Sequence, residues 1–369
     1  MKFICAGAAT GGHLYPALAV ADKLCRRKPE SECLFLGAKH EKNHIIEDAG
    51  YELRTIDTRG FNRKHLLKNI SVVKDLIVSS RQISHILTEF QPDAVFGSGG
   101  YVCGPVIREA HRKGIPAFLH EQNVIPGVAN KLAEKYADKV FVAFEESRHY
   151  FKNPDKIVVT GNPLRKAFLT AGVMHYRERL GIAEKDMALL IFGGSLGSSK
   201  INEVVSDMLI ALKDRSDMRV FFITGKRLYA DMLKKLTDAG VTASGKVSVI
   251  EYSDRMHEYY AAADLIIARS GALTVSEIAV CGKASILIPS PNVTGNHQYY
   301  NAKTLADKNA ALIINESELT SESLADEIRK LSANKEALNR LGAAARELGR
   351  PDATDVIADY IIGDVKGRA

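Results

Sequence analysis

The sequence predicts an α/β protein with two doubly wound parallel-sheet domains, and three observations lead to this fold class. Short apolar runs alternate with longer amphipathic segments along all 369 residues, which is typical of strands covered on both faces by helices. A glycine-rich loop follows the first apolar run of each half, at 7–13 and again at 193–197. The length itself favours two domains over one. We therefore expect two Rossmann-like units, each with a strand–turn–helix near its start.

Each expected strand is a nearly continuous apolar run, and each is followed by a segment with turn residues or helical periodicity. The strands expected in the first half are 3–6, 33–37, 53–56, 94–97, 117–119 and 140–143, with helices at 15–27, 66–90 and 105–113. The strands expected in the second half are 189–192, 220–224, 247–250, 265–268, 284–288 and 311–314.

Glycine and proline mark the predicted domain boundary. The sequence Gly-Asn-Pro at 161–163 interrupts the pattern, so the domains are predicted as 1–162 and 163–351. A second break, Gly-Arg-Pro at 349–351, precedes a further helical segment. We expect this segment, 352–369, to return to the first domain.

Composition narrows the class of protein. Hydrophobic residues make up 46% and charged residues 25% of the chain, which is ordinary for a globular protein. The net charge is +6, with most of the excess in residues 1–160, so an anionic partner is expected there unless these cations are only scattered surface lysines.

We expect neither a signal peptide nor a membrane span. Five cysteines without a CxxC pair predict reduced thiols rather than a metal site, and nucleic acid is not an expected partner.

The first glycine-rich loop contains a candidate base. A helix N-terminus at the carboxyl end of a strand is a site where phosphate or a polar sugar binds. Gly11 and Gly12 allow a ligand to approach the backbone closely, and Thr10 adds a hydroxyl. His13 stands where the helix begins, and we interpret it as a general base. The alternative is a histidine that only hydrogen-bonds substrate or caps the helix.

Two further loops of the first half follow strands and carry polar residues or glycine. The cluster around Gly99, Gly100 and Tyr101 favours a pocket for an extended phosphorylated ligand, with a tight turn as the alternative. The run His-Glu-Gln-Asn at 120–123 follows the next strand, and Glu121 is a second candidate base. The alternative for this run is a solvated loop.

The second half offers a candidate nucleotide site. Ser195 is predicted to open a helix at a phosphate-binding position, and Arg165 is placed to reach the same pyrophosphate. Glu277 lies about two turns into a later helix, where a carboxylate can accept hydrogen bonds from ribose hydroxyls. Gln298, after the next strand, is a candidate for binding sugar hydroxyls. The alternatives are a surface ion pair for Arg165 and a solvated helix position for Glu277.

Several catalytic fingerprints are absent from the sequence. There is no Gly-Lys-Ser/Thr after a glycine loop, no clean GxGxxG in the first half, and no Asp-x-Asp element placed to hold a metal. These absences disfavour a nicotinamide-linked dehydrogenase. They favour a metal-free transfer in which helix dipoles and cations stabilise a leaving diphosphate.

A basic and apolar segment near residue 65 is a candidate membrane contact. Cations and apolar side chains at helical spacing can lie on an anionic lipid surface. The residues assigned to this contact are Arg63, Lys64, Leu66, Lys68, Ile70 and Val73. The alternative is that the apolar stripe is the core face of a packed helix.

Taken together, these motifs resemble the peptidoglycan N-acetylglucosaminyltransferases of glycosyltransferase family 28, and the resemblance spans essentially the whole chain. The motifs that carry it are at 10–16, 99–105, 120–123, 161–165, 193–197, 269–277 and 297–298. Two departures are His297, where many relatives have Gln, and Cys103, where serine is frequent.

The resemblance implies a GT-B fold, with two domains facing a cleft, and an inverting transfer. N-acetylglucosamine would pass from UDP to the C4 hydroxyl of the muramoyl sugar in undecaprenyl-pyrophosphoryl-MurNAc-pentapeptide (lipid I), giving lipid II. No cofactor or essential metal is implied. A peripheral position at the inner leaflet is implied, with anionic lipids and other cell-wall or division proteins as partners.

The resemblance also implies roles for individual residues. The donor UDP-N-acetylglucosamine would contact Thr10, Gly11, Gly12, Asn123, Arg165, Ser195, Ser253, Ala272, Leu273, Thr274, Val275, Ser276, Glu277 and Gln298. The acceptor would contact Gly99, Gly100, Tyr101 and Asn130. Neither list separates His13 from Glu121 as the base.

Three other functions stay open at this point. One is a different lipid-directed transferase, such as one that uses diacylglycerol, although that acceptor has no diphosphate for the glycine loops to hold. Another is a UDP-sugar epimerase, which needs no lipid. The third is a non-catalytic regulator that binds a nucleotide sugar without transferring it.

Overall fold

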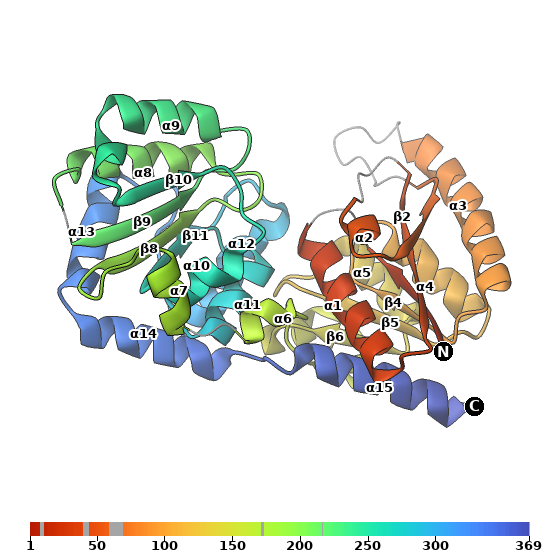
Figure 1. The fold of residues 1–369 in the computed structure, drawn as a ribbon. Helices are drawn as coiled ribbons and strands as arrows, with labels where there is room; N and C mark the ends of the chain where they lie inside the picture. Colours follow the sequence, from red (N-terminus) through yellow and green to blue (C-terminus); the bar gives the residue numbers. More distant parts are fainter. Residues whose placement is uncertain (8–10, 40–43, 59–68, 171–172, 216, 369) are drawn as a thin grey trace. The chain divides into compact units, whose positions relative to one another are not determined.

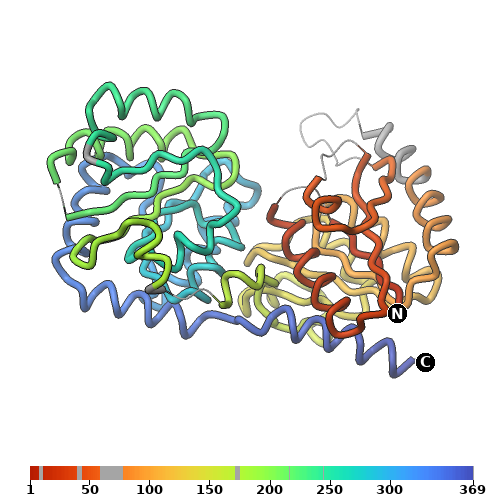
Figure 2. The backbone as a smooth tube through the Cα atoms, in the orientation of Figure 1, coloured from red at the N-terminus to blue at the C-terminus, as the bar shows by residue number. Residues whose placement is uncertain are grey.

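The computed structural model divides the chain into two compact units (Figures 1 and 2). One consists of Met1–Arg165 with Pro351–Ala369, and the other of Lys166–Arg350. The structure describes residues 1–7, 11–39, 44–58, 69–170, 173–215 and 217–368; at 69–77, 173, 174 and 244 it describes the backbone alone.

In its described part, the amino-terminal unit contains a seven-stranded sheet in the order β3-β2-β1-β4-β5-β6-β7, with every neighbouring pair parallel. The strands are β1 (Lys2–Ala6), β2 (Glu32–Ala38), β3 (Glu52–Ile56), β4 (Ala94–Gly97), β5 (Ala117–Glu121), β6 (Lys139–Val142) and β7 (Ile157–Val159). The strand order reverses between β1 and β4. Such a switch point is where open α/β sheets bind ligands.

Helices cover both faces of this sheet. They are α1 (Gly11–Arg27), α2 (His44–Asp48), α3 (Asn69–Phe90), α4 (Cys103–Arg112), α5 (Val128–Ala133) and α15 (Ala353–Arg368), with 3₁₀ turns η2 (Glu134–Tyr136), η3 (Glu145–Tyr150) and η4 (Pro154–Lys156). Alternation along β1 sends Ile4 to the core under α3 and α4, and Phe3 to the core under α1 and α15. Asp355 of α15 accepts hydrogen bonds from Lys23 at 2.7 Å and Arg27 at 2.8 Å, which fastens the last helix to α1.

The described part of the other unit contains a six-stranded parallel sheet in the order β10-β9-β8-β11-β12-β13. Its strands are β8 (Met187–Phe192), β9 (Met218–Ile223), β10 (Val247–Ile250), β11 (Leu265–Ala268), β12 (Ala284–Leu287) and β13 (Leu312–Ile313). Here the order reverses between β8 and β11. The strands β8, β11 and β12 are apolar and almost wholly buried, as expected for the centre of a parallel sheet, whereas the edge strands β10 and β13 are half-buried.

The helices of this unit are α6 (Lys166–Leu169), α7 (Val173–Arg179), α8 (Ser199–Ala211), α9 (Tyr229–Asp238), α10 (Met256–Ala262), α11 (Ala272–Cys281), α12 (His297–Ala306), α13 (Ser321–Ser332) and α14 (Lys335–Leu348), with η5 (Val241–Ser244) and η6 (Thr294–Asn296). The side chains of α8 and α13 form one apolar core with β8 and β9. None of the helices in the described ranges is both long and apolar enough to cross a membrane.

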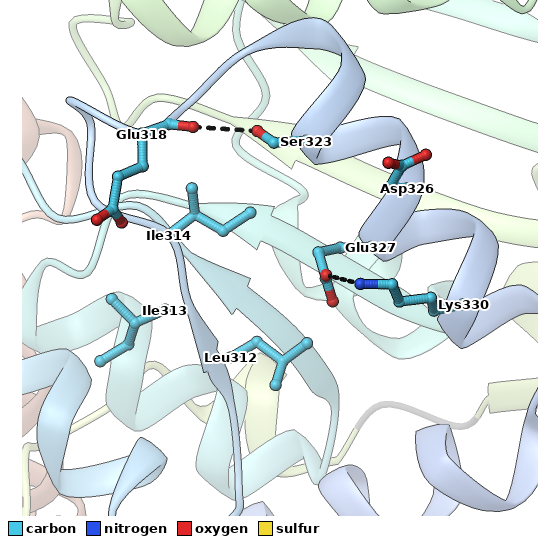
Figure 3. Close-up of a pocket in the computed structure, with 8 residues that line it drawn as sticks. All are labelled: Leu312, Ile313, Ile314, Glu318, Ser323, Asp326, Glu327 and Lys330. Carbon is cyan, nitrogen blue, oxygen red and sulfur yellow. Dashed lines mark hydrogen bonds and ion pairs between the residues drawn. The ribbon is translucent and has the colours of Figure 1, made fainter.

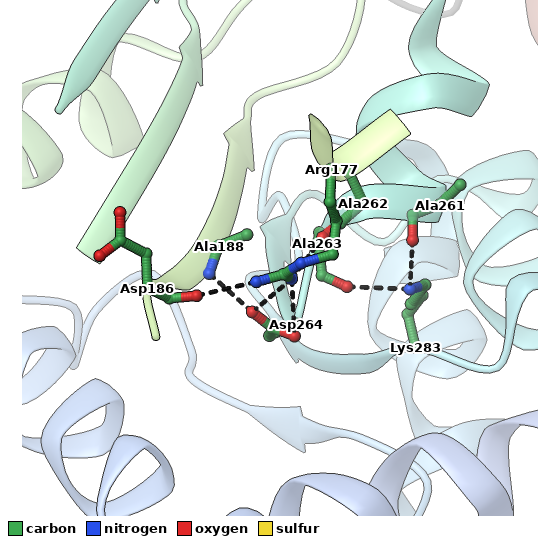
Figure 4. A network of polar contacts seen from close by, with 8 residues as sticks. All are labelled: Arg177, Asp186, Ala188, Ala261, Ala262, Ala263, Asp264 and Lys283. Atoms are coloured by element: carbon green, nitrogen blue, oxygen red, sulfur yellow. Dashed lines mark hydrogen bonds and ion pairs between the residues drawn. The ribbon is translucent and has the colours of Figure 1, made fainter. Parts of the chain in front are cut away.

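A polar network fixes the amino-terminal edge of this second sheet (Figure 4). Arg177 of α7 donates to the Asp264 carboxylate at 3.0 Å, and Asp264 accepts the Ala188 N–H at 2.7 Å. Lys283, which is largely buried, donates to two carbonyls at the end of α10, those of Ala261 at 2.7 Å and Ala263 at 2.9 Å. The loops that carry the candidate site lie at the opposite, carboxyl-terminal edge of this sheet.

Three of the differences from the expectations have a clear local cause. Strand β7 was not predicted, because Ile157–Val159 is too short to stand out as an apolar run. Helix α1 already begins at Gly11, since the glycines expected in the loop occupy its first turn. Helix α8 begins at Ser199 rather than at Ser195, because Ser198 is its N-cap and accepts the Ile201 N–H at 3.4 Å.

Candidate functional site

The predicted residues of the amino-terminal unit gather at the carboxyl edge of its sheet. His13 follows β1, Gly99 and Tyr101 follow β4, and Glu121 closes β5. These three strands are neighbours in the order β1-β4-β5, so their loops meet beside the switch point.

His13 is packed directly against the loop that follows β4. Its Nδ1 lies 3.0 Å from the Ser98 carbonyl oxygen and 3.0 Å from Oε1 of Gln122. Gly99 has φ +109°, and a Cβ there would come within 2.6 Å of His13 Nδ1. Glycine at this position thus allows the imidazole to lie against the backbone.

Cys103 stabilises the conformation of the loop that follows β4. Its sulfur accepts the Gly99 N–H at 3.0 Å, and its single S–H has two carbonyl acceptors within reach, those of Gly99 at 2.9 Å and Ala6 at 3.1 Å. Burial raises the pKa of the Cys103 thiol to about 12, so the thiol keeps its proton. A protonated thiol can make the donor contacts that a serine hydroxyl would make, which accounts for cysteine at this position.

Glu121 is buried, and both of its carboxylate oxygens are already occupied. One accepts Asn123 N–H at 2.9 Å and its Nδ2 at 3.2 Å; the other accepts Gly127 N–H at 3.0 Å and Asn130 Nδ2 at 2.8 Å. This arrangement suits a carboxylate that shapes the loop. Geometry therefore favours His13 over Glu121 as the base.

Asn130 and Arg165 also lie in the amino-terminal unit. Within the described part of the chain, the buried Asn130 Oδ1 has no hydrogen-bond partner, which leaves an acceptor for a ligand hydroxyl or amide. The Arg165 guanidinium lies 4.9 Å from the centre of the Tyr15 ring, a cation–π contact at the end of this unit's first segment.

In the carboxyl-terminal unit the predicted residues follow four strands of one sheet. Ser195 follows β8, Ser253 follows β10, the run 272–277 follows β11, and Gln298 follows β12. All of these strands are parallel, so the four loops share the carboxyl edge.

The loop after β8 is a tight glycine turn. Gly197 has φ +74°, and a Cβ there would come within 2.1 Å of the Thr224 carbonyl oxygen, so no larger residue fits. Ser195 is exposed at the tip of this turn and does not open α8 as predicted. Its hydroxyl and the neighbouring glycine amides remain suitable for a phosphate.

Helix α11 is the second candidate anion-binding element. It begins after Gly271, and no described side chain caps it there. The residues Ala272, Leu273, Thr274, Val275, Ser276 and Glu277 form its first two turns. Its N-terminus therefore suits a diphosphate, through both the backbone N–H groups and the helix dipole.

Glu277 is half-buried and lies beside a buried tyrosine. Burial and the Glu277 carboxylate together raise the pKa of the Tyr260 phenol well above its ordinary value. The Ser270 hydroxyl donates to the Gln298 carbonyl at 2.8 Å, and Gln298 Oε1 accepts the Ser290 N–H at 2.9 Å. These contacts join the loops after β11 and β12 into one surface.

Two other features were tested against the predictions. A cavity of about 500 Å³ lies between β13 and α13 (Figure 3), and none of the predicted residues lines it. No group of three His, Cys, Asp or Glu side chains in the described ranges is arranged to hold a metal ion.

Part of the predicted site falls outside the described residues. These are Thr10, Arg63, Lys64, Leu66 and Lys68. Ile70 and Val73 lie in α3, where the backbone alone is described. The membrane contact assigned to this segment therefore stays a prediction.

Comparison with protein families identifies the chain. The model described as Glycosyltransferase family 28 N-terminal domain matches residues 3–142, and that described as Glycosyltransferase family 28 C-terminal domain matches 188–357. The chain belongs to glycosyltransferase family 28. The predicted family is confirmed.

Relatives of this family 28 protein match along its whole length. A protein of Thermoanaerobacter sp. (strain X514) is 40% identical over 362 residues, 98% of this chain and 99% of that protein. One of Bacillus subtilis (strain 168) is 39% identical over 354 residues, 96% of each chain. Both are named UDP-N-acetylglucosamine--N-acetylmuramyl-(pentapeptide) pyrophosphoryl-undecaprenol N-acetylglucosamine transferase.

Solved structures agree with the fold of the family 28 protein. The crystal structure of MurG from Acinetobacter baumannii has a TM-score of 0.77 and 30% identity, covering 98% of this chain and 100% of that one. The predicted α/β fold class is therefore confirmed.

Sequence reasoning missed one organising residue of this family 28 site, Arg269. Its guanidinium donates to the Ile288 and Pro289 carbonyls at 3.1 Å and to the Ser198 hydroxyl at 2.7 Å, and it pairs with Glu316. It thus joins the loops after β8, β11, β12 and β13. The sequence placed Arg269 first in the motif at 269–277 that supports the family resemblance, but the motif does not reveal the partners of this residue.

Proposed function

We propose that this family 28 glycosyltransferase transfers N-acetylglucosamine from UDP-N-acetylglucosamine to lipid I, giving lipid II in peptidoglycan synthesis. The observation that carries the proposal is the match of about 40% identity along nearly the full chain to relatives named for this transfer. The polar and glycine residues at the carboxyl edges of both sheets supply suitable chemistry.

The carboxyl-terminal unit is proposed to bind the donor. The α11 N-terminus and the turn bearing Ser195 face the diphosphate, and Glu277 accepts the ribose hydroxyls. Ser253 and Gln298, on the loops after β10 and β12, complete the nucleotide-sugar contacts. Arg165, Thr10, Gly11, Gly12 and Asn123 are further proposed donor contacts.

The amino-terminal unit is proposed to bind the acceptor and to remove its proton. Gly99, Gly100, Tyr101 and Asn130 bind lipid I. His13 takes the proton of the C4 hydroxyl as its oxygen bonds to the anomeric carbon. The bond to UDP breaks with its electron pair on the diphosphate, which inverts the anomeric centre. Proton removal by a positioned base contributes about 10²–10⁴-fold.

The location and the other partners are part of the proposal. The acceptor is anchored in a membrane, and the basic and apolar segment around Lys64 and Lys68 is proposed to meet anionic lipids at the cytoplasmic face. Other cell-wall or division proteins are further proposed partners.

The transfer is proposed to need no metal ion. The helix N-terminus and nearby cations stabilise the leaving diphosphate in place of a metal. We expect the rate to be unchanged in excess EDTA. A rate that falls in EDTA and returns with Mg²⁺ would contradict this.

The proposed function is tested by following radiolabelled N-acetylglucosamine from its UDP donor. Label is expected on a short-chain lipid I analogue and not on diacylglycerol or in the absence of acceptor. Label on diacylglycerol would indicate a different lipid transferase. Epimerisation without acceptor would indicate an epimerase, and UDP binding without transfer to lipid I would indicate a regulator.

A further inference from the structure

A continuous chain of hydrogen bonds runs from His13 into the interior of the amino-terminal unit. His13 Nδ1 lies 3.0 Å from Gln122 Oε1, and Gln122 Nε2 lies 2.6 Å from the Ser98 carbonyl. Gln122 Nε2 also lies 2.9 Å from His120 Nδ1. His120 Nε2 lies 3.1 Å from the Gly161 carbonyl, where the chain ends.

The two backbone carbonyls at the ends of this chain allow only one direction of donation. A carbonyl oxygen can only accept, so His120 carries its proton on Nε2 and donates it to Gly161. His120 Nδ1 then has a lone pair and accepts from Gln122. The Gln122 amide therefore donates to both Ser98 and His120 through Nε2, and its Oε1 is left as an acceptor.

The same reasoning fixes the proton on His13. Its Nδ1 faces two acceptors, Oε1 of Gln122 and the Ser98 carbonyl, each at 3.0 Å. A bare Nδ1 would put lone pair against lone pair at both contacts, so the neutral ring carries its proton on Nδ1. Nε2 then holds the lone pair.

The buried surroundings keep the His120 ring neutral. His120 and Gln122 are buried at 0% and 2% exposure. Burial lowers the pKa of His120 to about 4, so the ring does not take a second proton near neutral pH. A cationic His120 would have to donate through Nδ1 and would reverse the Gln122 amide.

We infer that Gln122 and His120 are positioning residues that hold His13 in the Nδ1–H tautomer, with Nε2 as the atom that takes the acceptor's proton. The role of Nε2 in proton transfer rests on the proposed function, whereas the tautomer does not. Gln122 acts through His13 and touches no reacting atom. The ring is oriented by two neutral carbonyl-type acceptors, where many catalytic histidines use a carboxylate.

The tautomer can be measured directly on the full chain without substrate. Long-range ¹H–¹⁵N correlation spectra of histidine-labelled protein at pH 8 distinguish Nδ1–H from Nε2–H rings, and His13→Ala identifies the His13 signals. We expect the Nδ1–H form for His13 in the wild type. A wild-type His13 in the Nε2–H form would overturn the inference, whatever the variants do.

The positioning role is tested by Gln122→Met with Gln82→Met as its matched control. Gln82 makes two comparable hydrogen bonds in the same unit. Its Oε1 accepts the Asp57 N–H at 2.9 Å, and its Nε2 donates to the Asp57 carboxylate at 2.8 Å. We expect Gln122→Met to lower kcat at least fivefold and to add Nε2–H signal for His13, with Kd for UDP unchanged. Gln82→Met should change neither kcat nor the His13 signals.

The two outcomes of these experiments separate the inference from the proposed function. Equal kcat and equal spectra in both methionine variants would overturn the positioning role. A wild type that transfers nothing to the lipid I analogue would overturn the proposed function, while the spectrum would still decide the tautomer.

Discussion

The amino-terminal and carboxyl-terminal units reverse their strand order in the same way, at β1/β4 and at β8/β11. The chemistry at the two switch points differs. At β1/β4 the His13 imidazole lies against buried neutral groups, and at β8/β11 a glycine turn lies beside the N-terminus of α11, which no described side chain caps. One topology thus carries the candidate proton acceptor in one unit and the candidate anion site in the other. The comparison teaches that the loop residues, rather than the sheet, decide which half of the reaction each unit serves.

The largest expected effect is the loss of the proton acceptor. His13→Ala should lower kcat for transfer at least about 100-fold, because a positioned base contributes that much or more. KM for UDP-N-acetylglucosamine should stay within about twofold. Steady-state kinetics with the lipid I analogue measures both, and His85→Ala, at an exposed position on α3, is the control. A kcat within about threefold of wild type would remove His13 from the mechanism.

The second expected effect is an acid sensitivity that the buried His120 confers on the amino-terminal unit. Its pKa is about 4 in the folded chain and about 6.5 when unfolded, so the unfolded chain binds more protons between these values. Stability therefore falls as pH drops through this window, by roughly 2 kcal/mol between pH 6.5 and pH 5. Urea unfolding at pH 7 and pH 5 should show a smaller loss in His120→Asn. An equal loss in both proteins would argue against a neutral buried His120.

The third expected effect concerns the ribose contact proposed for Glu277 in the other unit. Glu277→Gln should raise KM for UDP-N-acetylglucosamine about tenfold, because hydrogen bonds to a charged group contribute about 1.5–3 kcal/mol. The matched control is Glu336→Gln, since Glu336 is exposed on α14 and pairs only with Arg340 among the described residues. If both variants have the same KM, Glu277 does not bind the donor.

The smallest expected effect comes from comparing two glycines of the motif at 99–105, Gly99 and Gly104. Gly99→Ala places a Cβ against the His13 ring at a left-handed backbone position, so kcat should fall about fivefold. Gly104→Ala meets nothing within 4 Å and should leave kcat unchanged. Kinetics on the pair decides whether Gly99 makes room for His13, because equal values would show that the close approach has no effect.

Much of the fold could be predicted from the sequence because parallel strands buried on both faces are continuous apolar runs. β4 and β11 were predicted at their observed bounds for this reason. β7 was missed because three residues carry too little pattern, and α8 was expected too early because Ser195 and Ser198 both resemble N-caps.

The candidate site was less predictable than the fold. Residues in the helices that follow strands, such as His13 and Glu277, could be found because parallel strands share a carboxyl edge. The roles of Gln122 and Arg269 could not, because each depends on which loops become neighbours across the sheet. Sequence ranked His13 before Glu121 as the base but kept Glu121 as a reserve candidate, since the donors that occupy the Glu121 carboxylate come from a loop whose shape appears only in the structure.

The different roles assigned to the two switch points are tested most directly by the Kd of His13→Ala for UDP, measured by isothermal titration calorimetry. The account predicts a Kd within about twofold of wild type, since His13 serves the acceptor and the carboxyl-terminal unit supplies most of the proposed nucleotide contacts. A Kd raised tenfold or more would show that the His13 side chain itself binds the donor, and would contradict its assignment as the base that acts on the acceptor.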